Sequence, residues 1–564
     1  MKFLEKNHIQ QLKIIYFISY LKEMRFLLMK KTIALITSSL LALGSLAGCS
    51  NANNNADAGN AGESGKEKVV TVAISSDGEM DKLDAATYNG PHPIYLMIYD
   101  GLTWDEGTSV APLLADSWDI SDDGKTYTFK IKENAKFSDG TDCDAEAVLF
   151  NMKRWVNDKS HESVTASMVE NMEVVDKNTI KITYKTPSNA ILKELTYPRP
   201  VRILSPASIT MDTGDDFGTF TKPVGSGQWM LDSYTKDQEF SLVPNPNYWG
   251  EKPKVDKIVF KVIPGGEART MALQSGEVDI IGGDLIGKLG AESYNILKND
   301  SRFKTYETDS IVSYFLAFNQ DSECFKDINV RKAINMAINK DALVNDLLSG
   351  LGSPATSVFA PGSQYVNDNN IPGYSYDPDE AKKLLSEAGY QDSNNDNVLE
   401  KDGQPFEVEL LLTADQVPEW KTIGEYTQSE LAKLGIKVNL KTVDENAYDD
   451  MRDKREFDLC VRRTSSDSWM PHGVIQDLFG RENPKMQAWI DQDLVSLVNE
   501  TLVSQGDDIQ KNYDKVFKTI YENAYTVPLY IPVTTYATSE RIKTFNPISN
   551  AYAAIDWGQL EITE

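Results

Sequence analysis

The sequence has little cysteine, little histidine and a deficit of positive charge. Its 564 residues include four cysteines and four histidines, and 57 basic residues against 84 acidic ones give a net charge of −27. So few cysteines exclude a scaffold built on disulfides, and no Cys-x-x-Cys pair offers a metal site. The histidine count excludes a histidine-rich metal centre. The strong acidity argues against nucleic acid as a partner, because a polyanion would be repelled.

Enzyme signatures are missing as well. The sequence contains no HExxH, GxSxG or GxxxxGK[ST] motif, and no cysteine has a base near it in the sequence. Cys460 lies in the apolar run 457–461, which favours a buried strand over a reactive thiol. We therefore expect no catalytic residue, no cofactor and no enzymatic activity.

The N-terminal 48 residues have the pattern of an export signal. Met29-Lys30-Lys31 is basic, residues 32–45 form a short uncharged apolar run, and Leu46-Ala47-Gly48-Cys49 follows. This order is typical of a secretory signal, and the run is too short for a stable membrane span. The tetrad resembles the bacterial lipobox, which implies cleavage before Cys49 and a lipid on its sulfur. We expect translation to begin at Met29, or at Met24, because a complete signal follows.

The residues after Cys49 suggest a tether. Residues 49–66 are rich in Asn, Ala, Gly and Ser and contain almost no large apolar side chain. Such a segment cannot bury enough surface to fold, so we expect a flexible link between a lipid and a folded body. The protein is thus expected on the extracellular face of the cell membrane.

The rest of the chain mixes strand and helix patterns without an internal repeat. Alternating apolar residues predict strands at 69–75, 126–132, 179–185, 257–263, 407–412, 437–443 and 527–533. Helical periodicity predicts helices at 144–156, 330–339, 341–348, from Asp377 to before Gly389, and at 419–434 before Gly435. The composition, 41% apolar and 25% charged, is globular, and the fold class is α/β or α+β with several lobes.

Six short segments carry a family likeness. They are Asp122-Asp123-Gly124-Lys125-Thr126-Tyr127-Thr128-Phe129, Lys136-Phe137-Ser138-Asp139-Gly140, Pro223-Val224-Gly225-Ser226-Gly227, Asn247-Tyr248-Trp249-Gly250-Glu251-Lys252-Pro253, Val330-Arg331-Lys332-Ala333-Ile334-Asn335 and Tyr376-Asp377-Pro378. In this order they resemble the family 5 extracellular solute-binding proteins, the peptide and nickel binding proteins of ABC importers. The resemblance implies a two-lobed fold of the type II periplasmic-binding-protein kind, with a ligand between the lobes.

The resemblance also implies a division of the chain. We expect the core of the first lobe in residues 67–110, 224–312 and 536–564, an extra domain of that lobe in 111–223, and the second lobe in 313–535. Asp122-Asp123-Gly124 is a turn signal between strands. Gly225 and Gly227 permit backbone shapes that other residues resist, which suits a crossing between lobes; we expect them to maintain the fold rather than to bind ligand.

Within the family the chain looks closest to the nickel-chelate binding proteins. Pro198-Arg199-Pro200-Val201-Arg202 resembles their Pro-Arg-Pro segment, whose first arginine grips a carboxylate of the chelator, and Arg199 is its counterpart. A guanidinium group is always charged and can hold a carboxylate with two parallel hydrogen bonds. The flanking prolines fix the backbone. The alternative is a surface arginine in a proline-rich loop.

Three further candidates come from the same resemblance. Tyr88 and His92 lie in a segment, 87–93, that matches the cleft-lining loop of nickel binders, and His161 lies near a position where those proteins place an arginine. Neutral imidazole is a good nickel ligand, so His92 and His161 are the candidate metal ligands. A single histidine is more often structural, and that alternative stays open for each.

One segment departs from the nickel binders. Residues 463–472 align with a cleft segment of the family and supply the candidate ligand-binding residues Arg463, Asp467 and Trp469, but the stretch 480–485 lacks the family's metal-coordinating histidine. Asp467 instead resembles the aspartate with which peptide binders hold an α-ammonium group. Trp469 could supply an apolar wall or a cation–π face.

We therefore expect a lipid-anchored, monomeric receptor that delivers a small carboxylate-bearing ligand to ABC permease and ATPase subunits. The expected ligand is nickel or another metal as an organic chelate, and the alternative is a di- or oligopeptide. A surface sensor or adhesin on the same fold is the alternative from another class.

Asp392-Ser393-Asn394-Asn395-Asp396 with Glu400 resembles the start of a calcium loop, but it lacks the glycine at the sixth position. We expect a polar hairpin turn there, with weak calcium binding as the alternative.

Overall fold

The computed structural model describes residues 67–563 apart from 88–89, 158–164, 212–216, 285, 414–418, 465–470, 481–487 and 549–554. The chain divides into residues 1–66 and one compact unit, residues 67–564, and only this unit is considered below. The predicted signal, Cys49 and the tether lie outside the described residues. Within the described part, no helix has both the length and the apolar character that a membrane crossing requires.

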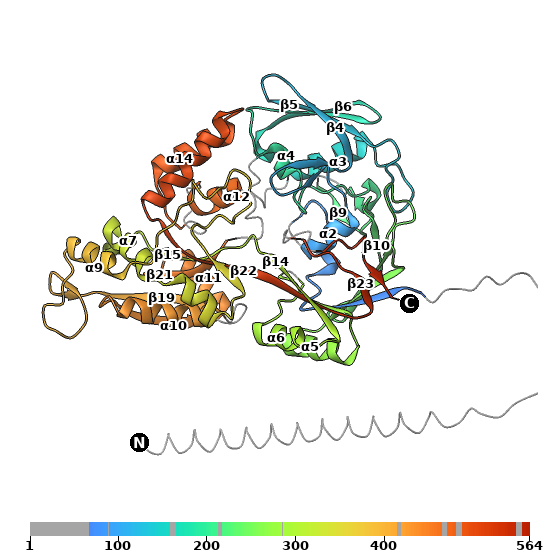
Figure 1. Cartoon of the computed structure of the whole chain (residues 1–564). Coiled ribbons are helices and arrows are strands. Elements are labelled where there is room, and N and C mark those ends of the chain that lie inside the picture. Colours follow the sequence, from blue (N-terminus) through green and yellow to red (C-terminus); the bar gives the residue numbers. More distant parts are fainter. Residues whose placement is uncertain are drawn as a thin grey trace, which may run out of the picture. The chain divides into compact units, whose positions relative to one another are not determined.

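A twelve-stranded mixed sheet organises the unit (Figure 1). Its main path runs in the order β10 (Trp229–Thr235), β11 (Glu239–Pro244), β12 (Lys257–Val262), β1 (Val69–Ile74), β13 (Ile280–Gly282), β22 (Thr526–Ser539), β15 (Tyr314–Phe318), β21 (Leu459–Arg463), β19 (Glu407–Thr413) and β20 (Lys437–Val443). Two more strands, β14 (Phe303–Asp309) and β16 (Gly352–Pro354), pair with β22 off this path.

The long strand β22 is shared by two lobes. Its C-terminal half pairs with β13 and β14 in the first lobe, where Tyr306 lies opposite Tyr536. Its N-terminal half pairs with β15 and β16 in the second lobe, where Tyr314 lies opposite Tyr530. Residues 310–313 join β14 to β15 and form a second crossing between the lobes. The two crossings lie side by side, as a hinge requires.

The first lobe has a parallel core with an antiparallel extension. β1 pairs in parallel with β12, and its residues Val70, Val72 and Ile74 are buried, as the apolar alternation predicts. The helices of this part are α2 (His92–Ile98), α5 (Gly266–Ser275) and α6 (Ala291–Lys298). Short strands complete it: β2 (Thr103–Asp105), β3 (Val110–Pro112), β8 (Ile209–Thr210), β9 (Thr219–Phe220), β23 (Ile542–Thr544) and β24 (Glu561–Ile562).

A separate four-stranded antiparallel sheet lies between these segments in the sequence. It has the order β4 (Ala115–Ile120), β5 (Thr126–Ile131), β7 (Thr179–Tyr184) and β6 (Val169–Asp176), and its helices are α3 (Ala145–Asn157) and α4 (Ile191–Glu194). Gly124 has φ +69° in the β4–β5 connection, and its N–H donates to the Ser121 carbonyl at 2.8 Å. The predicted turn at Asp122-Asp123-Gly124 is therefore confirmed.

Helices surround the second-lobe strands. They are α7 (Ile328–Ala337), α8 (Lys340–Ala342) followed by a π-helical turn (Leu343–Leu347), α9 (Pro378–Glu387), α10 (Glu419–Ala432), α11 (Glu445–Asp453), α12 (Pro471–Ile475) followed by a π-helical turn (Gln476–Gly480), α13 (Gln492–Val503) and α14 (Asp508–Glu522). At the start of α9 the Asp377 carboxylate accepts from the Glu380 N–H at 2.9 Å. Gly389 follows the helix with φ +90°, so both predicted ends of this helix are confirmed.

The helical turns predicted at residues 341–348 are confirmed, because α8 (Lys340–Ala342) continues as the π-helical turn Leu343–Leu347. One expectation about backbone shape was wrong. Gly225 and Gly227 do not adopt the left-handed backbone region, and they lie within the first lobe rather than at a crossing. Their small size is what matters, because a Cβ on Gly225 would lie 1.9 Å from the Ile98 carbonyl oxygen.

The predicted division of the chain at residues 110, 223, 312 and 535 stays a prediction. The topology places the crossings at residues 310–313 and within β22, so a border after residue 535 would fall inside a strand. A strand that continues from one lobe into the other is a hinge rather than a boundary.

Candidate functional site

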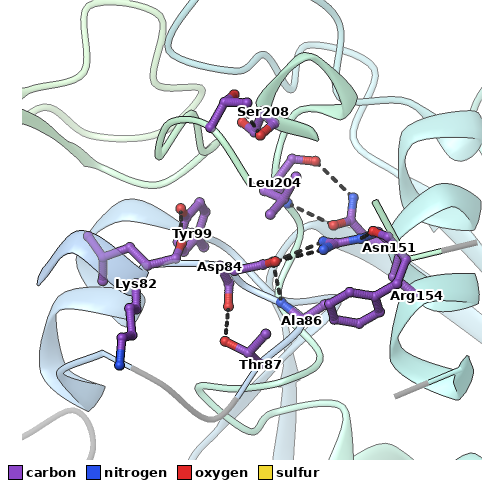
Figure 2. Close-up of polar contacts among 12 residues, drawn as sticks. Lys82, Asp84, Ala86, Thr87, Tyr99, Asn151, Arg154, Leu204 and Ser208 are labelled. Atoms are coloured by element: carbon purple, nitrogen blue, oxygen red, sulfur yellow. Dashed lines mark hydrogen bonds and ion pairs between the residues drawn. The ribbon is translucent and has the colours of Figure 1, made fainter. Parts of the chain in front are cut away.

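A buried ion pair anchors the loop that precedes α2. Asp84 accepts two hydrogen bonds from Arg154 of α3, at 2.9 Å from Nη1 and 2.7 Å from Nη2 (Figure 2). The Arg154 side chain is fully buried, and its Nε donates to the Phe217 carbonyl. The other contacts of Asp84 order the loop itself, since its carboxylate accepts from the Ala86 N–H and its carbonyl from Thr87. A bidentate pair of this kind fixes direction as well as distance.

Helix α3 also holds the segment that follows Arg199. Asn151, one turn before Arg154, donates to the Leu204 carbonyl at 2.8 Å and accepts from the Leu204 N–H at 3.2 Å (Figure 2). The helix therefore positions two segments that are more than a hundred residues apart in the sequence. These are the segments that the resemblance assigned to the ligand site.

Arg199 lies directly against the first of these segments. Its Nη1 donates to the Gly90 carbonyl at 2.7 Å, and its guanidinium carbon is 6.0 Å from the centre of the Tyr95 ring. The side chain is only partly buried. Tyr95 in turn donates to the Asp84 carbonyl at 3.0 Å. Arg199 thus contacts the 87–93 segment through the Gly90 carbonyl, while a shared role in ligand binding stays a prediction.

Arg202, three residues later, has the opposite environment. It is 1% exposed, and its Nη2 donates to the Thr196 carbonyl. Burial lowers its pKa to about 10, against the nearby charge of Asp100. Burial also raises the pKa of Asp100 to about 6, although Trp249 Nε1 donates to this carboxylate at 2.8 Å. Arg202 nevertheless lines the first-lobe cavity described below, together with Asp100, whereas Arg199 is partly exposed outside that lining.

Arg463 lies at the edge of the second lobe beside the hinge. It is the last residue of β21, its side chain is exposed, and it pairs with Tyr314 of β15. The next residue, Thr464, exchanges two hydrogen bonds of 2.9 Å with Ser313 in the crossing formed by residues 310–313. The segment that contains the predicted residues Asp467 and Trp469 thus starts from a fixed point at the hinge.

Four predicted site residues lie outside the described part of the chain. They are Tyr88, His161, Asp467 and Trp469. His92 is the first residue of α2, but its side chain is not described either. The roles of these five residues, including metal binding by His92 and His161, stay predictions.

The first lobe contains a cavity of about 510 Å³ next to this site. It runs along α2, from Pro93 to Tyr99, and the other walls come from β2, β3, Tyr248 and residues 555–558. Pro93 directly follows His92 in the chain. Among the residues that the structure describes, the walls of this cavity come from the first lobe.

The acidic loop at 392–400 has the predicted hairpin character. Gln391 and Glu400 form a bridge, and Asp392 accepts from the N–H groups of Asn395 and Asn397. One carboxylate oxygen each from Asp392, Asp396 and Glu400 lies within 4.8 Å of the others, in an exposed or half-exposed setting. The alternative of weak calcium binding stays a prediction.

Sequence reasoning missed the pairs that hold the site together. Asp84 and Arg154 are 70 residues apart, and no local pattern joins them. It also missed a cross-lobe pair, in which His472 Nε2 of α12 lies 3.8 Å from Glu194 Oε1 of α4, both side chains being buried. A histidine at the end of the 463–472 segment was the only available signal for this second pair.

Curated relatives are binding proteins for several ligands. The chain is 29% identical over 477 residues to the nickel-binding periplasmic protein of Escherichia coli (strain K12), which covers 80% of this chain and 90% of that protein. It is 31% identical over 383 residues to the glutathione-binding protein GsiB of Salmonella paratyphi A, covering 67% and 70%. It is 27% identical over 552 residues to the oligopeptide-binding protein AppA of Bacillus subtilis, covering 94% and 99%.

Solved structures show the same fold. NikA from Brucella suis, in complex with Fe(III)-EDTA, matches with a TM-score of 0.82 and 26% identity over 88% of this chain and all of that chain. AppA from Bacillus subtilis, in complex with a nonapeptide, matches with a TM-score of 0.70 and 23% identity over 88% and 100%. The profile of the bacterial extracellular solute-binding proteins, family 5, matches residues 109–485. The chain therefore belongs to the family 5 solute-binding proteins, with their two-lobed fold.

Proposed function

We propose that this chain is the lipid-anchored receptor of an ABC importer, and that it captures nickel or another metal as an organic chelate bearing a carboxylate. In this proposal Cys49 carries the lipid, residues 49–66 are the tether, and the folded unit delivers its ligand to permease and ATPase subunits. Binding favours the closed arrangement of the lobes through its differential affinity for that state. No bond of the ligand is made or broken.

Arg199 is the observation that supports a carboxylate ligand. It is reachable, its Nη1 is held by the Gly90 carbonyl, and it lies against the loop that carries Tyr88. A guanidinium group is always charged and can hold a carboxylate with two parallel hydrogen bonds. The resemblance to the nickel-binding protein of Escherichia coli supports a metal chelate as the carrier of that carboxylate. His92 and His161 are the proposed metal ligands.

Titration calorimetry of the full-length protein with the nickel(II)–histidine complex tests this proposal. Loss of a charge-assisted hydrogen bond costs about 1.5–3 kcal/mol, so Arg199→Ala should weaken binding about ten- to a hundredfold. Arg302→Ala is the matched control, because Arg302 pairs with the neighbouring Asp300 at the surface, and its loss should leave affinity unchanged. Equal affinity of native protein and Arg199→Ala would remove Arg199 from the site.

A short peptide is the second candidate ligand. It is favoured by Asp467, whose position resembles the aspartate with which peptide binders hold an α-ammonium group, and by the likeness to AppA. Arg199 and Asp467 together would then hold the two ends of a zwitterion. Two results together would make a peptide the proposed ligand in place of the chelate. The native protein would not bind nickel(II)–histidine, and Asp467→Asn would lose the tripeptide binding of the native protein.

A surface sensor or adhesin remains the alternative from another class. Uptake by a strain that lacks the protein separates it from a transport receptor. Lost uptake of nickel or peptide supports transport, whereas intact uptake with lost signalling or adhesion supports the alternative.

A further inference from the structure

One short segment of the first lobe penetrates the second lobe. Residues 188–190, just before α4, contact the end of α13 and the side of α14. Ser188 is 4% exposed and Ala190 is 1% exposed. Ala190 belongs to an apolar cluster whose other members, such as Leu502 and Phe517, come from the second lobe. This segment of the first lobe is therefore buried against helices of the second lobe.

Asn189 makes the directed contacts of this segment. Its backbone N–H donates to the Leu502 carbonyl at 3.1 Å, and its Nδ2 donates to the Thr501 carbonyl at 2.7 Å. Both carbonyls lie in the last turn of α13, and the Thr501 carbonyl also accepts from the N–H of the capping residue Ser504 at 3.2 Å and from its Oγ at 2.6 Å. On the other side, the Tyr513 hydroxyl of α14 donates to Asn189 Oδ1 at 3.3 Å. One amide side chain thus joins two helices of the opposite lobe.

A second contact lies on the same side of the molecule. Gln505 Nε2, just after α13, donates to the Asp123 carbonyl at 3.4 Å in the β4–β5 turn. The buried pair of Glu194 and His472 is a third contact. Three residues of the first lobe, Asp123, Asn189 and Glu194, therefore contact α12, α13 and the loop after α13. None of these contacts lies at the hinge, where β22 and residues 310–313 connect the lobes. A rotation about the hinge would separate all of them.

We propose that Asn189 is a closure latch, which stabilises the closed arrangement of the lobes before any ligand arrives. This rests on the proposed function, in which the ligand is enclosed between the lobes. When the lobes part, the hydrogen bonds between the Asn189 amide and the α13 carbonyls are replaced by hydrogen bonds to water. Ala190 then leaves its apolar surroundings. The latch therefore sets how much of the unliganded protein is closed, and with it the affinity for any ligand that the closed state binds.

Distance measurements between spin labels test the latch without a ligand. Labels at Lys177→Cys, in the first lobe, and Lys511→Cys, on α14, sit at exposed positions of the two lobes. The full-length protein carries Cys49→Ser and Cys324→Ser, while Cys143 and Cys460 are buried and free. We expect a dominant short-distance population that shrinks in Asn189→Ala, with the closed-to-open ratio falling about tenfold, as expected for the loss of cross-lobe hydrogen bonds.

Two further variants separate the latch from a general loss of stability. Tyr513→Phe removes only the hydroxyl that contacts Asn189 Oδ1, so it should shift the distances in the same direction but less, and add little to Asn189→Ala. Asn299→Ala is the matched control, because Asn299 donates to the Asn295 carbonyl at the end of α6 within the first lobe. It should leave the distances unchanged.

Either of two results would overturn the latch. One is a distance distribution of Asn189→Ala that equals that of the native protein, and the other is a native distribution without the short-distance population. Neither result depends on which ligand the protein binds, or on whether it binds one at all. Failure of the latch is therefore distinguishable from failure of the proposed function.

Discussion

The two arginines of the 198–202 segment differ in burial although they lie three residues apart. Arg199 and Arg202 have the same chemistry, yet Arg199 is reachable and Arg202 is 1% exposed. Arg202 shares a buried region with Asp100, and each charge makes the other less costly to bury. The family likeness selected Arg199 alone as the ligand-binding candidate, and that role stays a prediction.

Asp100 gives this buried region a pH dependence. Burial raises its pKa from the ordinary value of 3.8 to about 6, so the folded chain holds the proton more tightly than the unfolded chain. The free energy of unfolding must then fall as the pH rises from about 4 to about 6. Above this window Asp100 is ionised in both states, and the total loss of stability has reached about 3 kcal/mol. Asp100→Asn removes the titration, while its side-chain oxygen can still accept from Trp249.

The check is urea denaturation of native protein and Asp100→Asn at several pH values. The unfolding free energy of the variant minus that of the native protein should increase between pH 4 and 6 and stay level from 6 to 8. A difference that is constant over the whole range would show that Asp100 does not carry a raised pKa.

At the scale of the element, α3 is the support of the candidate site. Its Arg154 anchors the loop before α2, and its Asn151 anchors the segment after Arg199.

Removing one partner of a buried ion pair leaves an uncompensated charge, which costs about 3–5 kcal/mol. Asp84→Ala should lower the free energy of unfolding by this amount, measured by urea denaturation. Asp300→Ala breaks a surface pair with Arg302 and should cost less than about 1 kcal/mol. Equal losses in the two variants would contradict the anchoring role of Asp84.

Local patterns predicted the elements that local chemistry controls. The strand at 437–443 was predicted with the observed bounds, and the capping residues of α9 gave both of its ends. The strand predicted at 527–533 extends to Ser539, because it crosses into the first lobe and pairs with β13 and β14 there. Such an extension depends on partners distant in the sequence, which no local pattern contains.

The candidate site was predictable only as far as the family likeness reached. That likeness selected Arg199 and the 87–93 segment, which the structure brings together through the Gly90 carbonyl. It gave no sign of Asn189, or of the Asp84–Arg154 pair, because these contacts join segments that have no motif of their own. Contacts of this kind appear only once the chain is folded.

For the whole molecule, the topology explains how a ligand could be enclosed. The lobes are connected by one long strand and one short crossing, so they can rotate about a narrow hinge. A half-exposed ion pair, Lys288 with Glu419 at 2.9 Å, and the stacked rings of Tyr314 and Tyr530 lie at this hinge and resist sliding. The contacts around Asn189 act far from it, where a small rotation produces a large separation.

The central claim is that the protein carries a metal chelate with a carboxylate. Native mass spectrometry of the protein as purified from cells, combined with metal analysis, tests it most directly. We predict a bound mass that contains nickel or another metal together with a small organic acid, and its loss in Arg199→Ala but not in Arg302→Ala. Bound peptide masses without any metal would contradict the claim, and they would make Asp467 the centre of the site.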